Sequence, residues 1–253
     1  MTQHKSLITS AWLKRLALLC MVIDHTAVAL IELGILQTEG QYSYESLMTA
    51  FNIYTWMRSI GRLAFPIYLF LLVEGFHKTH DFKKYLLRMG GMAVLAEVPF
   101  DLALYGSWFY WGHQNVLFEF FLLLILFHFL QKFKNSLWYQ ALIISLILII
   151  TAFVMPDYDL FGIVAGVLFY YAYGNRTSQA LIVIPAMSFE WFYPTVFLSA
   201  IPIFAYKGDK GKLWSSLHYW AYPLHLIILY FVRLYFFGLN CQVNCNSTEW
   251  NTS

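Results

Sequence analysis

The sequence contains little charge. Only 12% of its 253 residues are Asp, Glu, Lys or Arg, about half the share that a soluble domain carries. Because so few charges cannot cover a water-facing surface, the composition excludes an ordinary soluble globular protein. The net charge of +2 is too small to indicate a nucleic-acid-binding surface. With 60% hydrophobic and 20% aromatic residues, the chain is predicted to be a polytopic membrane protein.

Several catalytic and metal-binding motifs are also missing. The sequence has no Walker loop, no GxSxG nucleophile elbow and no CxxC pair. Of its three cysteines, Cys20 lies in an apolar run, while Cys241 and Cys245 lie in the C-terminal tail, where spacing alone does not establish a disulfide. His25 and His225 are too far apart in sequence to indicate a metal site. No metal is therefore expected.

Apolar runs long enough to cross a bilayer recur along the chain. A helix needs about 20 mostly apolar residues to cross ~30 Å of hydrocarbon. The predicted fold class is all-α, a polytopic transmembrane helix bundle of about nine spans: 12–34, 56–77, 84–105, 114–131, 137–154, 158–174, 178–190, 192–206 and 214–237. Because Pro185, Pro194 and Pro202 interrupt the seventh and eighth runs, one re-entrant pair is the alternative there.

The chain is expected to form one domain. No internal repeat and no low-complexity linker divides residues 1–253. Within that domain the helix bundle would occupy 12–237, and a short tail would follow at 238–253.

Lys and Arg lie on alternate connections between the predicted spans. Thirteen of the 16 basic residues precede the first span or join spans 2 and 3, 4 and 5, 6 and 7, or 8 and 9. The opposite connections, 35–55, 106–113 and 155–157, and the tail contain none. Because basic loops stay on the cytoplasmic side, we predict a cytoplasmic N-terminus and a C-terminal tail outside the membrane.

Ionisable residues inside the predicted spans are the main functional signal, because such residues are costly in a bilayer and usually mark a site. At 1.5 Å per residue, five of them fall about 17–25 Å from the cytoplasmic edge. Glu74 and Glu119 are expected at the rims of their spans, the first within reach of cytoplasmic water. The coincidence in depth predicts a buried polar chamber formed by His25, Arg62, Glu97, Asp101 and His225.

The chamber predicts specific pairings. Glu97 and Asp101 are four residues apart, on one helix face, and we expect Arg62 to be their counter-ion. One of these carboxylates is expected to orient His25 as a general base, because Asp24 points about 100° away from its neighbour. A purely structural set of ion pairs is the alternative.

Several of these residues lie in motifs that resemble the TraX family. The match extends in order over about residues 12–235 and includes Asp24-His25, Glu97-Val98-Pro99-Phe100-Asp101, Gln114-Asn115-Val116 and Tyr222-Pro223-Leu224-His225. That family is named for a conjugation protein that acetylates pilin, and it is distantly similar to membrane-bound O-acyltransferases. The resemblance implies an acetyl-CoA-dependent N- or O-acetyltransferase in the bacterial cytoplasmic membrane, acting on pilin or a cell-surface glycan.

The resemblance also implies roles for individual residues. Catalysis is expected from five polar residues of the spans: His25, Arg62, Glu97, Asp101 and Asp24. Substrate binding is expected from four others: Gln114, Asn115, His225 and Glu74. The phosphates of acetyl-CoA would bind four basic residues at the cytoplasmic face: Lys14, Arg15, Lys84 and Arg88. Arg62, or the amides of Gln114 and Asn115, would stabilise an oxyanion.

Two other classes of function compete with acyl transfer. A secondary transporter or proton-coupled permease would also place carboxylates and histidines at the midplane. Against it, the two halves of the sequence show no inverted repeat. A non-catalytic assembly factor is the third reading, and it leaves the polar layer unexplained.

Overall fold

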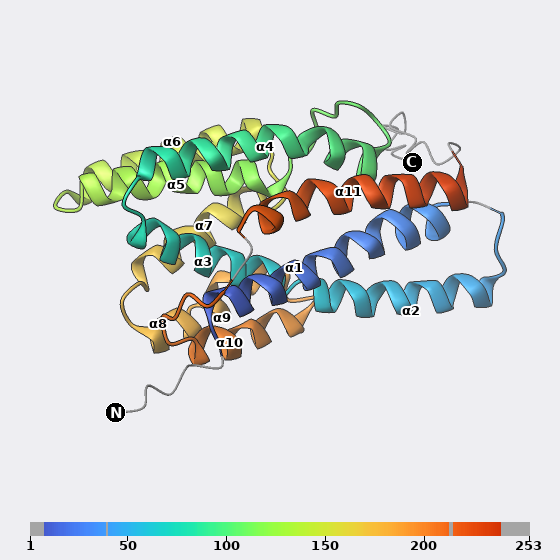
Figure 1. The fold of residues 1–253 in the computed structure, drawn as a ribbon, viewed down its shortest axis with the longest axis horizontal. Helices are drawn as coiled ribbons and strands as arrows, with labels where there is room; N and C mark the ends of the chain where they lie inside the picture. Colours follow the sequence, from blue (N-terminus) through green and yellow to red (C-terminus); the bar gives the residue numbers. More distant parts are fainter. Residues whose placement is uncertain (1–7, 39, 213–214, 239–253) are drawn as a thin grey trace, which may run out of the picture.

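The regular structure of the described residues is helical (Figure 1). The computed structural model describes residues 8–38, 40–212 and 215–238. Within these ranges there is no strand, and one isolated bridge joins Gln114 to Pro156. The predicted all-α class is therefore confirmed. The tail cysteines, Cys241 and Cys245, lie outside the described residues.

The helices follow one another with short connections. In chain order they are α1 (Ser10–Thr26), its π-helical continuation η1 (Ala27–Leu36), α2 (Tyr44–Gly61), α3 (Ala64–Lys78), α4 (Phe82–Tyr105), α5 (Val116–Lys132), α6 (Leu137–Val154), α7 (Asp159–Tyr171), α8 (Arg176–Leu181), α9 (Val183–Ala186), η2 (Ser188–Glu190), η3 (Pro194–Ser199), α10 (Ala200–Ala205) and α11 (Ser215–Phe237).

Local residues determine several helix ends. The side chains of Thr9, Asp81 and Asn115 accept backbone N–H groups at the starts of α1, α4 and α5, where the first turn has no partners of its own. Gly106 ends α4 in the left-handed conformation, with φ of +67°, which glycine adopts without a steric penalty.

The long helices lie roughly along the longest axis of the molecule (Figure 1). α11 packs against α4 and α1, α4 packs against α5, and α1 packs against both α2 and α3. The short helices α8, α9 and α10 gather on one side, where α8 contacts α10. This arrangement brings the first and last helices together although they are far apart in sequence.

The connection 207–212 ties α11 to the start of α1. The N–H of Ser10 donates to the carbonyl of Asp209 over 2.8 Å, and that of Ala11 donates to Lys210 over 3.0 Å. Arg15 donates to the carbonyl of Lys212 over 3.1 Å. Because the first N–H groups of a helix need outside partners, this connection both caps α1 and fixes its position beside α11.

Two groups of buried apolar side chains form the core. The larger lies among α1, α3, α5 and α7 and contains the fully buried rings of Phe70, Phe127 and Phe169. The smaller joins α1, α4 and α11 through residues that include Phe100 and Tyr222. The candidate site is built beside this smaller group.

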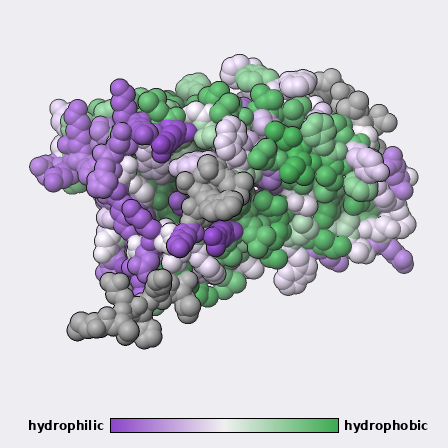
Figure 2. Space-filling model, viewed as in Figure 1, coloured by the Kyte–Doolittle hydropathy of each residue, from purple (hydrophilic) through white to green (hydrophobic). Residues whose placement is uncertain are grey.

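Four helical segments in the described ranges are long and apolar enough to cross a membrane: Ser10–Leu36, Tyr44–Lys78, Leu137–Val154 and Tyr219–Phe237. Their outward side chains are apolar as well; Leu224, Ile228 and Phe231 of α11 are examples. Figure 2 shows apolar residues over much of this face and hydrophilic residues gathered at the end that carries the α5–α6 connection. These are the features of a membrane protein.

Two regions differ from the expected spans. Residues 35–55 were expected to be a connection but include the start of α2, so 44–78 forms a helical unit of 35 residues with a turn at Arg62 and Leu63. At 1.5 Å per residue this is about 52 Å, longer than one ~30 Å crossing. The expected spans 178–190 and 192–206 are not full-length helices: 176–190 is divided into α8, α9 and η2, and η3 with α10 forms a short apolar stretch, Pro194–Ala205. The pair thus departs from two full helical spans, and the re-entrant alternative stays a prediction.

Glycines of α7 allow its close contact with α5. The Cβ of an alanine at Gly162 would overlap the carboxylate of Glu119, and one at Gly166 would overlap Leu123. The interpretation of this Gly-xxx-Gly pair as a packing motif is therefore confirmed.

We predict that Gly162→Ala destabilises the protein. The added methyl group must displace Glu119 or separate α7 from α5, so the free energy of unfolding should fall by about 1–3 kcal/mol. The measurement is the midpoint of thermal unfolding in detergent. Gly91→Ala is the matched control, because nothing lies within 4 Å of its added Cβ. Equal midpoints for the two variants would contradict the packing assignment.

Candidate active site

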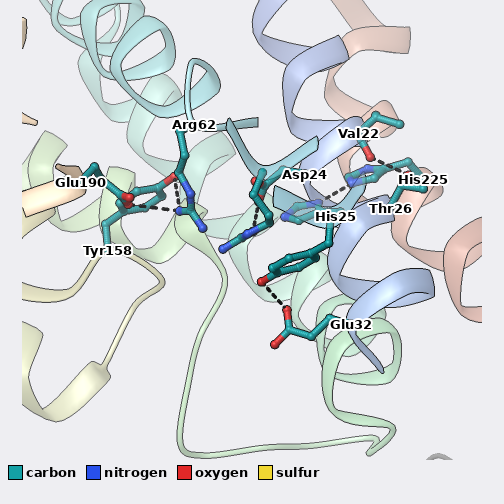
Figure 3. A network of polar contacts seen from close by, with 11 residues as sticks. Val22, Asp24, His25, Thr26, Glu32, Arg62, Tyr158, Glu190 and His225 are labelled. Carbon is teal, nitrogen blue, oxygen red and sulfur yellow. Dashed lines mark hydrogen bonds and ion pairs between the residues drawn. The ribbon is translucent and has the colours of Figure 1, made fainter. Parts of the chain in front are cut away.

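Two buried histidines from the first and last helices contact each other. Nδ1 of His25 on α1 lies 2.7 Å from Nε2 of His225 on α11, and the two rings are nearly parallel (Figure 3). Nδ1 of His225 lies 2.9 Å from the carbonyl of Ala221. The two side chains are 7% and 9% exposed. The predicted meeting of His25 and His225 in one buried layer is confirmed.

These contacts determine where the protons lie. A carbonyl oxygen can only accept, so His225 must carry its proton on Nδ1. Its Nε2 is then an acceptor, and Nδ1 of His25 must donate to it. The remaining nitrogen of His25, Nε2, therefore holds a lone pair. The prediction that a carboxylate of α4 orients His25 is wrong, because His225 occupies that place.

Asp24 forms an ion pair away from its neighbour His25. Its carboxylate lies 2.5 Å from the guanidinium of Arg58 on α2. The absence of a side chain at Gly61 leaves the space that Asp24 occupies. The expectation that Asp24 does not orient His25 agrees with this contact.

Arg62 has a different partner from the predicted one. Its guanidinium lies 3.2 Å from the carboxylate of Glu190 in η2 and donates to the hydroxyl of Tyr158 over 3.4 Å (Figure 3). The predicted pairing of Arg62 with Glu97 and Asp101 is therefore wrong. The physical reason is the turn between α2 and α3, which directs Arg62 toward η2 and the α6–α7 connection.

The carboxylates of α4 hold the loop that leads into α5. Asp101 accepts the N–H of Tyr110 over 2.8 Å, and Glu97 accepts both the backbone N–H and the side-chain amide of Asn115. Pairing with these donors explains how two acids on one helix face do without Arg62. Gln114 donates its amide to the carbonyls of Tyr110 and Trp111. The amides of Gln114 and Asn115 thus stabilise the loop.

Glu74 and Glu119 are more buried than expected. Glu74, 5% exposed, pairs with Lys78 and with Arg176 of α8, so it does not simply reach water. Glu119 is fully buried and accepts the N–H of Tyr158 over 3.2 Å, so the prediction of a rim position is wrong. Both carboxylates join helices that are distant in sequence.

A cavity of about 490 Å³ enters from the end of the molecule that carries the basic residues. We call it the basic cavity. Lys14, Lys84 and Arg88 line it, as does Lys78, whereas Arg15 is not among its lining residues. Farther into the bundle its lining is formed by apolar and aromatic residues of four helices: Leu18 and Met21 of α1, Met89 and Met92 of α4, Phe120 of α5 and Tyr222 of α11. A charged entrance thus leads to an apolar interior.

A second cavity, of about 310 Å³, lies farther along α1 and α4 and is also lined by η1 and α2. We call it the His25 cavity, and its polar lining is Asp24, His25, Glu32, Gln37, Tyr54, Arg58, Arg62, Tyr105 and Asp157. Desolvation raises the pKa of Asp157, while Arg62 and His113 act in the opposite direction. The hydroxyl of Tyr54 donates to Glu32 over 2.8 Å. This cavity is polar and contains both signs of charge.

The π-helix η1 supplies one wall of the His25 cavity. Val28 and Glu32 of η1 line this cavity together with Asp24 of α1 and Gln37, the residue that follows η1. Sequence reasoning did not single out Glu32, although it lies within the first expected span, eight residues after Asp24. It also missed Tyr158 and Glu190, which lie in short connections without a periodic signal.

A comparison with protein families agrees with the motifs. The family described as TraX protein matches residues 9–233. This chain belongs to the TraX family. It is also 24% identical over 257 residues to a "Probable fimbrial assembly protein FimC, serogroup H1" of Dichelobacter nodosus, an alignment that covers 88% of this chain and 95% of that relative. No solved structure matches the chain.

We predict that Arg62→Leu destabilises this TraX-family protein through Glu190. An enclosed carboxylate without its cation should lower the free energy of unfolding by about 3 kcal/mol. In detergent, the double variant Arg62→Leu, Glu190→Leu should have a thermal unfolding midpoint between those of Arg62→Leu and wild type. The control is Arg62→Leu, Asp101→Leu, whose thermal unfolding midpoint should be no higher than that of Arg62→Leu. Recovery by Asp101→Leu would instead support the pairing expected from the sequence.

Proposed function

We propose that this protein is an integral membrane acyltransferase that moves an acetyl group from cytosolic acetyl-CoA to an amine or hydroxyl of an exported acceptor. The observation that carries the proposal is the position of His25 between two cavities. The basic cavity is bounded by Tyr222, whose ring meets the ring of His25 edge-on at 6.1 Å. His25 itself lines the other cavity.

The basic cavity suits the acyl donor. Lys14, Lys84 and Arg88 offer positive charge to the phosphates of coenzyme A at the entrance. The apolar interior suits the pantetheine arm. Along α1, the distance from Lys14 to His25 is about 17 Å at 1.5 Å per residue, so an extended arm would bring the thioester to the histidine pair.

The His25 cavity suits the acceptor. Its carboxylates from Asp24, Glu32 and Asp157 and its guanidinium groups from Arg58 and Arg62 offer partners for a polar group. The name of the Dichelobacter relative, a probable fimbrial assembly protein, supports an acceptor related to pilin; a cell-surface glycan is the other possibility. With a cytoplasmic N-terminus, this cavity would lie toward the outer side of the bacterial cytoplasmic membrane.

The proposed reaction uses the lone pair of His25. As the acceptor nitrogen or oxygen attacks the thioester carbon, Nε2 of His25 takes its proton. The carbonyl π electrons move to oxygen and then reform the double bond as the C–S bond breaks. The leaving thiolate receives the proton from His25, which restores the neutral imidazole. His225 acts as a positioning residue, because it holds His25 in the required tautomer.

A transporter is less well supported by these contacts. Glu97 and Asp101 would be its expected ion-binding or proton-relay groups, yet both accept hydrogen bonds from the loop before α5. Because both carboxylates already accept these hydrogen bonds, we assign the two residues a structural role within the proposed acyltransferase.

We predict that His25→Ala abolishes acetyl transfer while the protein still folds. Loss of a general base should lower the rate by about 10²–10⁴-fold. The measurement is release of free CoA from acetyl-CoA by purified protein, with alanine amide as a surrogate acceptor. His128→Ala is the control, because this exposed histidine stacks on Phe82 outside both cavities. A His25→Ala rate within about threefold of wild type would remove His25 from the mechanism.

We also predict that Lys84→Ala combined with Arg88→Ala weakens the use of acetyl-CoA. Loss of two charge-assisted contacts should raise KM by at least about tenfold and leave kcat nearly unchanged. The same kinetic assay measures both constants. Lys132→Ala with Lys134→Ala is the control, because these residues do not line the basic cavity. A similar KM for both double variants would place the phosphates elsewhere.

A further inference from the structure

Acyl transfer needs a hydrogen-bond donor for the oxyanion that forms on the thioester carbonyl. The groups that the sequence led us to expect in this role already have partners in the protein. The amide of Asn115 donates to Ala93 and Glu97, and that of Gln114 donates to two backbone carbonyls. Arg62 pairs with Glu190. The donor must therefore come from another side chain near His25.

Tyr222 stands where such a donor is needed. It lies one helical turn before His225 on α11, and its ring meets those of His25 and His225 edge-on, with centroids 6.1 and 5.6 Å apart. It also lines the basic cavity. One side chain thus contacts both the histidine pair and the proposed donor cavity.

The hydroxyl of Tyr222 has no hydrogen-bond partner among the described residues, although the side chain is only 7% exposed. A buried hydroxyl without a partner costs free energy, and most buried polar groups in proteins are paired. A ligand that supplies an acceptor would remove this cost. The cavity that Tyr222 lines is the one that we propose for acetyl-CoA.

We infer that the hydroxyl of Tyr222 donates a hydrogen bond to the thioester oxygen of the acyl donor and stabilises the oxyanion. This inference rests on the proposed function. As the acceptor attacks the carbonyl carbon, the π electrons move to oxygen, and the O–H of Tyr222 donates a hydrogen bond to the charge that develops there. Tyr222 keeps its proton throughout. The acceptor's proton goes to His25 and then to the departing thiolate.

Other tyrosines of the basic cavity fit this role less well. The hydroxyl of Tyr85 lies beside Gly75, near the charged entrance, whereas Tyr222 contacts the histidines. Tyr68 has an interaction of its own. Tyr219, which also lines the cavity, is 42% exposed. Among these four tyrosines of the described structure, Tyr222 alone combines an unpaired hydroxyl with contact to His25.

The kinetic test is Tyr222→Phe in the full-length protein, assayed by release of CoA from acetyl-CoA with alanine amide as acceptor. Loss of one oxyanion donor should lower kcat by about 10²–10³-fold and change KM by less than about twofold. Tyr230→Phe removes a hydroxyl from the same helix outside both cavities and should leave both constants unchanged. A kcat of Tyr222→Phe within about threefold of wild type would overturn the inference.

The thermal stability of Tyr222→Phe distinguishes an oxyanion-binding role of the hydroxyl from a structural one. Because the hydroxyl has no protein partner, Tyr222→Phe should have a thermal unfolding midpoint equal to or above that of wild type. A clearly lower midpoint would show that the hydroxyl serves the fold and would overturn the inference.

A spectroscopic measurement tests the hydrogen bond itself. Acetyl-CoA labelled with ¹³C at the carbonyl is bound to His25→Ala protein, which should not turn it over, and its infrared carbonyl stretch is recorded. The stretch should lie at lower frequency than in the His25→Ala, Tyr222→Phe double variant. Equal frequencies would overturn the role of Tyr222 and leave the proposed function intact. If wild-type protein neither bound nor used acetyl-CoA, both would fall.

Discussion

The hydrogen bond between His25 and His225 joins two side chains that are 200 residues apart, and the candidate site is organised around it. A buried imidazole is costly unless its N–H group finds a partner. Here the carbonyl of Ala221 satisfies His225, and His225 satisfies His25. The chain of contacts ends at a lone pair on His25, so satisfying the buried groups also produces a base.

Most of the charged side chains around this pair have a partner of their own. Asp24 pairs with Arg58 and Arg62 with Glu190, while the acids of α4 accept N–H groups from the loop before α5. Pairing keeps the cost of buried charge low. It also leaves the histidines in contact mainly with each other and with an aromatic ring, an environment that favours neutral imidazole.

Depth within the bundle could be predicted from the sequence, but direction around each helix could not. Counting 1.5 Å per residue placed His25 and His225 in the same layer, and the structure brings them into contact. Arg62 was placed at that depth too, yet a turn between α2 and α3 directs it toward Glu190. Each residue rotates a helix by about 100°, so one break in a helix is enough to change a pairing. The π-helix that brings Glu32 into the cavity has no periodic signal in the sequence.

The backbone contacts between 207–212 and the start of α1 have a consequence for how the protein is made. They set the register of α1 against α11, and a shift of one residue would move the histidines by about 1.5 Å and 100° relative to each other. Because His225 lies 200 residues after His25, a nascent chain carries His25 through the synthesis of all these residues without the group that fixes its tautomer. The histidine pair is therefore completed only when α11 joins the bundle, and in the proposed acyltransferase a chain without α11 in place has no assembled base.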